Sequence, residues 1–251
     1  MLRNSFVFID GFGPRKEKSL WKNGIEDWDS FLNSPKIPRL SSALKSYADR
    51  QIKLAKQSLY SIDSSYFSQK LPSGEQWRLF DFFKEDAVYL DIETTGLKGN
   101  DVTVVGLYDG LEYKSMIKGI NLDFNHLFSE LEKYKLIITF NGDSFDLPIL
   151  RKLNAVPKIA SFDLRHACKR IGLKGGLKEI ERTMGFARPQ IVDGMHGGDA
   201  LSLWKIYRAT GDKYYLDLLL QYNEEDCANL KPIAEHVCSQ LKSALQIQIA
   251  R

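Results

Sequence analysis

Cysteine and histidine are scarce in this sequence. Its 251 residues include three Cys and four His. The cysteines form no CxxC pair and the histidines show no zinc-ligand spacing, which argues against a disulfide framework and against a zinc site. An odd number of unpaired thiols is typical of proteins in a reducing compartment, so we expect a cytoplasmic location.

Long hydrophobic runs and low-complexity tracts are also missing. No stretch approaches the roughly 20 apolar residues that cross a bilayer, and the apolar run near the N-terminus is short and contains Asp10. We therefore expect neither a signal peptide nor a membrane partner. Hydrophobic residues make up 43% of the chain and charged residues 27%, which is typical of a globular protein. Nothing in the sequence indicates an oligomeric state.

Charge is unevenly distributed along the chain, although the net charge is only +3. Residues 1–80 contain 13 Lys and Arg against 8 Asp and Glu, a net charge of +5, which leaves −2 for residues 81–251. A basic segment beside an acidic one could bind a phosphate chain close to carboxylate-bound cations. A solvated charged surface explains the same pattern.

The chain divides into three stretches. Residues 1–35 are interpreted as a compact helical hairpin, because glycines form a turn at DGFGP and apolar residues follow at helical spacing. Residues 36–80 are interpreted as a helical linker that contains one long helix between residues 40 and 62. From residue 87 the pattern changes to short β-rich runs, and we predict one α/β domain over residues 81–245.

Three strands followed by alternating helix and strand are expected in this domain. The expected strands are residues 87–93, 102–108, 113–117, 136–140 and 158–162, and the helices between them are residues 123–134 and 145–153. Turn residues separate the first three strands, which predicts an antiparallel meander. The remainder is mostly helical. The order predicts the α/β class, with a mixed five-stranded sheet flanked by helices and a small helical N-terminal extension.

Two carboxylates share one face of the first strand. Side chains alternate along an extended chain, so Asp91 and Glu93 point to one face while Leu90 and Ile92 point to the other. Neighbouring carboxylates repel each other, and burial raises the pKa of at least one unless a cation offsets the repulsion. A divalent metal ion is the simplest such cation. A water-facing acid pair on an edge strand is the alternative, but the apolar neighbours indicate an interior strand.

A second acidic position follows the fourth strand, in FNGDSFDLPIL. Asp146 stands at the expected start of a helix, where its apolar neighbours Phe145 and Leu147 would hold it beside the sheet. Asp143 is the alternative carboxylate, but it lies among turn residues. An acid at this position could also have only a structural role, in which its negative charge stabilises the positive end of the helix dipole.

A third acidic position lies in LLLQYNEEDCANL, within a long expected helix. Tyr222 and Asp226 are four residues apart, so a phenol and a carboxylate share one helical face and can converge on a single site. The neighbouring Glu224 and Glu225 project elsewhere. Alone, Tyr222 is as readily a core residue and Asp226 a solvated acid.

Together these motifs resemble a known nuclease superfamily. DIETTGL, FNGDSFDLPIL and YNEEDCANL are similar to the three exonuclease motifs of the DEDD superfamily, in the DEDDy subgroup with a tyrosine in the third motif. The arrangement from Asn141 to Pro148 is similar to the proofreading domains of family B DNA polymerases. GGLKEIERTMG and GGDALSLWKIY resemble the YprB-like exonucleases, which have an RNase H-like fold. The resemblance covers about residues 60–240.

The resemblance implies a metal-dependent 3′→5′ exonuclease that releases nucleoside monophosphates from a nucleic acid, with single-stranded DNA favoured over RNA. Carboxylate oxygens would hold two divalent cations, Mg²⁺ or Mn²⁺. Asp91 would contact both ions, and Tyr222 would orient the attacking water. Glu93 and Asp226 would complete the site of one ion, and Asp146 would support the other. The residues implied to contact the nucleic acid are Thr94, Thr95, Gly96, Leu97, Asn141 and Phe145.

Two other functions are compatible with the motifs. A 3′→5′ exoribonuclease would use the same site. A non-catalytic nucleic-acid-binding or scaffold domain would keep the fold, but the complete set of four acids argues against it.

Some polar residues have simpler interpretations. Asp163 and Asp199 more readily cap helices than bind a metal. Lys174 and Lys178 flank two glycines and could meet phosphates, although a solvated face is the simpler interpretation.

The N-terminal segment resembles a helix-hairpin-helix module. In such a module Gly11, Gly13 and Lys16 or Lys18 would meet a phosphate. A hairpin that only packs, with its tryptophans docked on the rest of the chain, is equally compatible.

Overall fold

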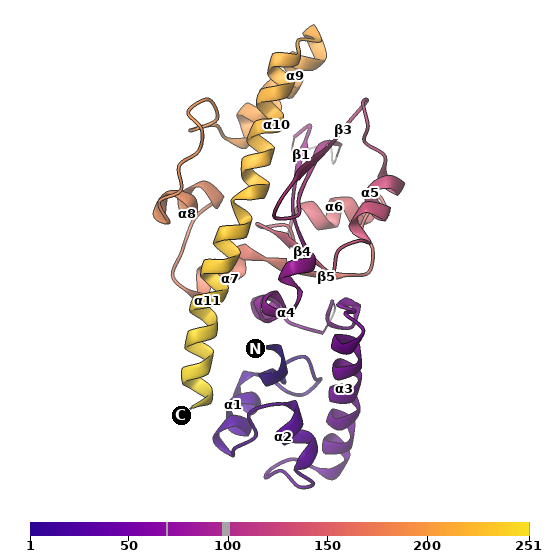
Figure 1. The fold of residues 1–251 in the computed structure, drawn as a ribbon, viewed down its shortest axis with the longest axis vertical. Coiled ribbons are helices and arrows are strands. Elements are labelled where there is room, and N and C mark those ends of the chain that lie inside the picture. Colours follow the sequence, from indigo (N-terminus) through magenta and orange to yellow (C-terminus); the bar gives the residue numbers. More distant parts are fainter. Residues whose placement is uncertain (69, 97–100, 251) are drawn as a thin grey trace.

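A mixed five-stranded sheet forms the centre of the chain after residue 86 (Figure 1). The computed structural model describes residues 1–68, 70–96 and 101–250. The strands are β1 (Ala87–Thr94), β2 (Val102–Tyr108), β3 (Tyr113–Ile117), β4 (Leu136–Thr139) and β5 (Ala160–Asp163). They lie in the order β3-β2-β1-β4-β5, antiparallel from β3 to β1 and parallel from β1 to β5. The predicted α/β class and mixed sheet are confirmed.

Helices cover both faces of the sheet. The first residues of β1 carry apolar side chains on both faces, and each face is buried by helices. Leu90 and Ile92 pack with α5 (Phe124–Leu131) and α6 (Asp146–Lys152), whereas Tyr89 belongs to the cluster on the opposite face. The elements on that opposite side are α7 (Leu164–Arg170), α8 (Leu177–Thr183), α9 (Gly197–Thr210), α10 (Lys213–Ala228) and α11 (Leu230–Ile249). The alternation therefore directs Asp91 and Glu93 toward the side of the long C-terminal helices.

The helices predicted within residues 1–35 and the long helix after them are present. They are α1 (Pro14–Lys22), α2 (Trp28–Asn33) and α3 (Ser42–Tyr60). Gly24 follows α1 with a φ of 75°, a left-handed conformation that glycine adopts at little cost. Trp21 and Trp28 are buried, and their indole nitrogens donate to the carbonyls of Asn4 and Ser5 at 3.1 and 2.7 Å. Both tryptophans therefore hold the N-terminal segment against the hairpin.

The N-terminal helices pack on the rest of the chain. The segment after the predicted linker helix forms short helices at Ser65–Phe67, Ser73–Leu79, Phe80–Phe83 (α4) and Lys84–Asp86. Within it, the buried Arg78 forms two hydrogen bonds of 2.9 Å to the buried Glu17 of α1. Helix α1 also contacts α11, and one hydrophobic cluster runs from Leu2 to Leu245. The domain boundaries at residues 35 and 80 stay a prediction.

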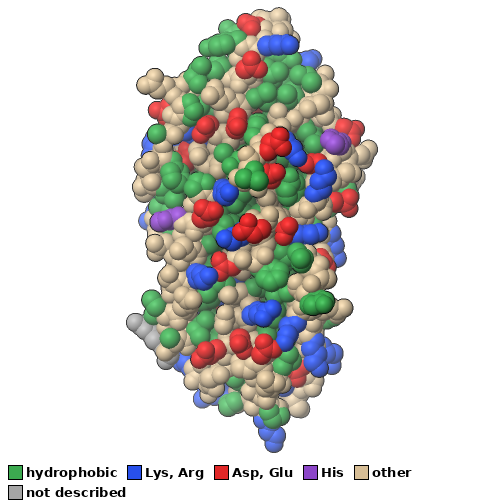
Figure 2. Space-filling view, viewed as in Figure 1, with side chains coloured by type: hydrophobic (Ala, Val, Ile, Leu, Met, Phe, Trp, Pro, Cys, Tyr) green, Lys and Arg blue, Asp and Glu red, His purple; other side chains and the backbone are tan. Residues whose placement is uncertain are grey.

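The surface shows no separation of charge on the face in Figure 2, where acidic and basic side chains are interspersed along the molecule. Among the helices that the structure describes, none has the length and apolarity needed to cross a bilayer.

Candidate active site

Three of the four predicted carboxylates meet where β1 ends. Asp91 and Glu93 project from β1, and Asp226 projects from α10, which contacts both β1 and β2. One oxygen from each carboxylate lies within 4.8 Å of the others, close enough to share a metal ion. The strand alternation and the helical position of Asp226 thus converge on one acidic cluster.

Asp146 joins this cluster from the opposite side of the sheet. It is the first residue of α6 and is 3% exposed. Its Oδ1 accepts a hydrogen bond of 3.0 Å from the backbone N–H of Ile92, which lies between the two acids of β1. Asp143, the alternative in this motif, instead lies with Asp163 and His166. The structure therefore brings Asp146, and not Asp143, to the acidic residues of β1.

Burial and mutual repulsion hold protons on the cluster. Burial, followed by the charges of Asp146, Asp226 and Glu93, raises the pKa of Asp91 well above its ordinary value. Burial, followed by the charges of Asp226 and Asp146, raises the pKa of Glu93 to about 8. Burial also raises the pKa of Asp146 to about 7, although the Ile92 N–H opposes that shift. A nearby cation would stabilise the ionised carboxylates, as expected for a metal site.

Arg188 supplies one positive charge beside the cluster. Its guanidinium donates to Asp226 and, through Nε and Nη2 at 2.7 and 2.6 Å, to both carboxylate oxygens of Glu181. All three side chains are largely buried, and Asn229 donates a further bond of 3.2 Å to Glu181. The pKa of Asp226 is raised by burial, and Arg188 is the main influence that opposes the shift.

Lys178 supplies a second positive charge, next to Tyr222. Its Nζ lies 3.0 Å from the Tyr222 hydroxyl and 4.2 Å from the centre of the ring. Tyr222 is 4% exposed, and burial together with the charge of Asp226 raises the pKa of its phenol, which keeps the hydroxyl protonated. The interpretation of Lys178 as a solvated residue is therefore wrong, because α8 places this side chain against α10.

A small residue in β2 lets α10 approach the sheet. Asn223, fully buried, donates a bond of 2.8 Å to Asp91 Oδ2 and accepts one of 2.8 Å from the Tyr113 hydroxyl. A Cβ atom at Gly106 would lie 1.9 Å from Asn223 Oδ1. Only glycine leaves room for the amide that orients Asp91.

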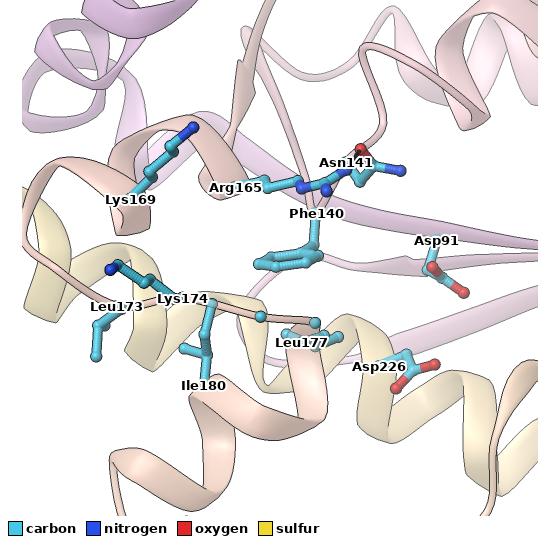
Figure 3. Close-up of a pocket in the computed structure, with 12 residues that line it drawn as sticks. Asp91, Phe140, Asn141, Arg165, Lys169, Leu173, Lys174, Leu177, Ile180 and Asp226 are labelled. Carbon is cyan, nitrogen blue, oxygen red and sulfur yellow. Dashed lines mark hydrogen bonds between the residues drawn. The ribbon is translucent and has the colours of Figure 1, made fainter.

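A cleft of about 610 Å³ opens from the acidic cluster along α7. We call it the active-site cleft. Its lining residues are Asp91, Phe140, Asn141, Arg165, Lys169, Leu173, Lys174, Gly175, Gly176, Leu177, Ile180 and Asp226. Figure 3 shows Asp91 and Asp226 at one end, Lys169 and Lys174 toward the other, and the ring of Phe140 between them.

The residues predicted to contact nucleic acid differ in their exposure and in whether they line the active-site cleft. Asn141 lines the active-site cleft with a φ of 66°, and its side chain accepts a hydrogen bond from Arg165. Phe145, just before α6, is 42% exposed, so much of its surface could meet a ligand. Thr94, Thr95 and Gly96 are half-buried at the end of β1, and Leu97 lies outside the described residues.

Two predicted capping residues act as expected. Asp163 caps α7 by accepting from the Arg165 N–H at 3.0 Å, and it also accepts from the N–H groups of Asn141 and Asp143. Asp199 accepts from the His196 N–H at 2.7 Å at the start of α9. Neither aspartate belongs to the cluster formed by Asp91, Glu93 and Asp226.

Arg188, Asn223 and Gly106 were missed by the sequence reasoning. Asn223 could have been found, because it adjoins Tyr222 in the third motif. Arg188 lies in an irregular segment between α8 and α9 with no periodicity to signal its position. Gly106 sits inside a strand, where an isolated glycine can mark a close backbone approach.

The donor set fits a hard divalent cation. Carboxylate oxygens are the ligands that Mg²⁺ and Mn²⁺ prefer, and the raised pKa values of Asp91 and Glu93 report crowded negative charge that such an ion would relieve. The residues that could share an ion are Asp91, Glu93 and Asp226.

Comparison with known proteins supports the fold and the position of the site. A family model described as the RNase H superfamily matches residues 88–238, more than half of the chain and the stretch that carries all four carboxylates. No curated protein sequence matches. The mixed sheet, the acidic cluster and this match together show that the chain belongs to the RNase H superfamily.

Proposed function

We propose that the protein is a metal-dependent 3′→5′ exonuclease of the DEDDy subgroup, with a YprB-like domain. It would hydrolyse nucleic acid, with single-stranded DNA preferred, to nucleoside monophosphates. The observation that carries the proposal is the meeting of Asp91, Glu93 and Asp226 within 4.8 Å, with Tyr222 one helical turn before Asp226. An RNase H superfamily domain with such a cluster implies a nucleic acid substrate and a nuclease reaction.

Asp91, Glu93, Asp146 and Asp226 would hold two divalent cations, Mg²⁺ or Mn²⁺. When bound, such cations lower the pKa of water and neutralise negative charge on a phosphodiester. Glu93 and Asp226 would take the site of one ion, and Asp146 that of the other. Asn223 would keep Asp91 oriented between them through the bond to Oδ2.

Tyr222 would position the attacking water. Its oxygen already accepts a hydrogen bond from Lys178, so its own proton is available for a water oxygen or a phosphate oxygen. The raised pKa of the phenol keeps that proton in place. Tyr222 would therefore act as a donor that fixes the direction of attack.

The preference for a 3′ end rests on the resemblance of the three motifs to the DEDD superfamily. The preference for DNA rests on the segment from Asn141 to Pro148, which resembles proofreading exonucleases, and on the N-terminal segment that resembles a helix-hairpin-helix module. The complete set of four acids supports catalysis over a scaffold function.

The proposal is tested with oligonucleotides that carry a label at the 5′ end. Wild-type protein should shorten single-stranded DNA stepwise from the 3′ end in Mg²⁺ or Mn²⁺ and should be inactive in EDTA. Matched RNA and duplex DNA would show the preferred substrate, and faster degradation of RNA would contradict the DNA preference. Products that appear at internal positions first, or equal activity in EDTA, would contradict the exonuclease or the metal requirement.

A further inference from the structure

The active-site cleft carries three positive charges that lack an acidic partner. Arg165, Lys169 and Lys174 are exposed. Across residues 1–68, 70–96 and 101–250, none of the three forms an ion pair. Arg170, on the same helix as Lys169, is instead paired with Glu75 at 2.7 Å. The charges in the cleft are therefore available to an anionic ligand.

An apolar wall accompanies these charges. Phe140, Leu173 and Leu177 are half-buried, so each keeps part of its surface toward the cleft, and Ile180 is buried at its base. In Figure 3 the Phe140 ring lies between the two carboxylates and the lysines. A ring face of this kind can stack with an unpaired base, whereas the bases of a duplex keep their faces stacked on one another.

We infer that the active-site cleft binds a single-stranded polynucleotide next to the phosphodiester that would be cleaved. The acidic end takes the terminal phosphodiester, a base packs on Phe140, and the preceding phosphates lie along Arg165, Lys169 and Lys174. The position of the strand end rests on the proposed function, because only that function places the reaction at the carboxylates. Binding along the basic and apolar walls does not depend on hydrolysis.

Charge removal tests the phosphate contacts. Fluorescence anisotropy in EDTA would measure the affinity of 5′-labelled oligo(dT) and oligo(U) of about 12 nucleotides, a length that spans a single-strand site. The triple variant Arg165→Gln, Lys169→Gln, Lys174→Gln should bind at least about tenfold more weakly. For this variant, the slope of log affinity against log salt concentration should become less steep by about 2. Each of the three phosphate contacts with a single strand contributes roughly 0.7 to that slope.

Lys152→Gln is the matched control. Lys152 is an exposed lysine on α6, on the opposite side of the sheet from α7, and it should leave both affinity and salt dependence unchanged. Unchanged binding by the triple variant would overturn the inference. An equal loss in Lys152→Gln would also overturn it, because the effect would then reflect total charge and not the cleft.

A second variant tests the base contact while it keeps an apolar side chain at a position that packs against the core. Phe140→Leu should lower affinity about tenfold, the scale of losing one stacked base, and should abolish the quenching of a 2-aminopurine placed near the 3′ end. Retained quenching, or a duplex that binds as tightly as the single strand, would overturn the single-strand assignment. If the wild type binds as expected but does not hydrolyse the strand in Mn²⁺, the proposed nuclease function fails while the binding site stands.

Discussion

The ammonium group of Lys178 donates a hydrogen bond of 3.0 Å to the hydroxyl of Tyr222, across 44 residues of chain. Lys178 also lies close enough to Asp226, Glu181 and Glu93 for their charges to raise its pKa, although burial has the larger effect and lowers it. The lysine fixes the direction of the Tyr222 O–H bond. Because the Tyr222 oxygen accepts a hydrogen bond from the ammonium group, the hydroxyl proton must point away from Lys178.

Lys178→Met should therefore slow catalysis more than it weakens substrate binding. We expect kcat to fall about tenfold, the scale of one charge-assisted hydrogen bond. Tyr222→Phe should produce a similar loss, and the double variant should be little worse than either single one, because both act through the same hydroxyl. Single-turnover rates would measure this. Fully additive losses, or a change in KM alone, would show that the pair does not act together.

Asp91→Asn should abolish activity and stabilise the metal-free protein. The substitution replaces a buried carboxyl group, whose ionisation burial and its acidic neighbours oppose, with a neutral amide of the same shape. We expect a rate loss of about a hundredfold or more and a higher Tm in EDTA, by about 2–4 °C for each 1 kcal/mol gained. Thermal unfolding and single-strand degradation would be measured on the same samples. Asp217→Asn, at an exposed position of α10, is the control and should change neither.

The metal-free protein should lose stability as the pH rises. The pKa values of Glu93 and Asp146 are raised to about 8 and about 7, so the folded protein holds these protons more tightly than the unfolded chain does. Their contribution to stability is present at low pH and is lost as pH increases through 7 and 8. Tm in EDTA should fall from about pH 5 to about pH 8, between the ordinary carboxyl pKa and the raised values, and less so in Glu93→Gln.

Divalent metal should reverse this dependence. Ions compete with protons for the same oxygens, so Mn²⁺ should stabilise the protein more at high pH than at low pH. A Tm in EDTA that is flat or rises with pH, with Glu93→Gln identical to wild type, would contradict the raised pKa values.

Arg188→Met should destabilise the protein strongly. The substitution leaves Glu181 and Asp226 without their shared cation in a buried setting, which typically costs about 3–5 kcal/mol. Urea unfolding at neutral pH would measure the loss. Mn²⁺ should recover part of it, because an ion at Asp226 replaces one of the two interactions. A loss below about 1 kcal/mol would mean that water reaches these carboxylates and screens them.

Gly106→Ala should disturb the site from β2, where Gly106 is paired with Asp91 and faces α10. The added methyl group would lie 1.9 Å from Asn223 Oδ1, so α10 must shift or the asparagine must turn away from Asp91. We expect a stability loss of about 1–3 kcal/mol, as for other overpacked positions, together with a lower kcat. Gly198→Ala, which meets nothing within 4 Å, should be silent in both measurements.

Local periodicity explains which parts of the site could be predicted. The two-residue alternation of β1 places Asp91 and Glu93 on one face, and the four-residue spacing of Tyr222 and Asp226 places both on one face of α10. These relationships depend only on neighbours in the chain. The strand and helix order likewise predicted the mixed sheet, because each element carries its own apolar pattern.

The remaining contacts depend on long-range packing that no local pattern encodes. Arg188 reaches Asp226 across 38 residues, and Asn223 reaches Asp91 across 132. The position of Arg188 depends on the path of the segment between α8 and α9. The position of Asn223 depends on how closely α10 packs against the sheet. Lys178 was interpreted as solvated from its place beside two glycines, and only the packing of α8 against α10 brings its side chain to Tyr222.

The hydrophobic cluster that joins α1, α4 and α11 has a practical consequence for work on the RNase H superfamily region alone. A shortened protein that starts near residue 81 would present Phe83, Leu241 and Leu245 to water, because it would lack the N-terminal members of the same hydrophobic cluster and the contact between α1 and α11. We expect such a fragment to aggregate through this exposed apolar surface, which the first 80 residues cover in the full chain.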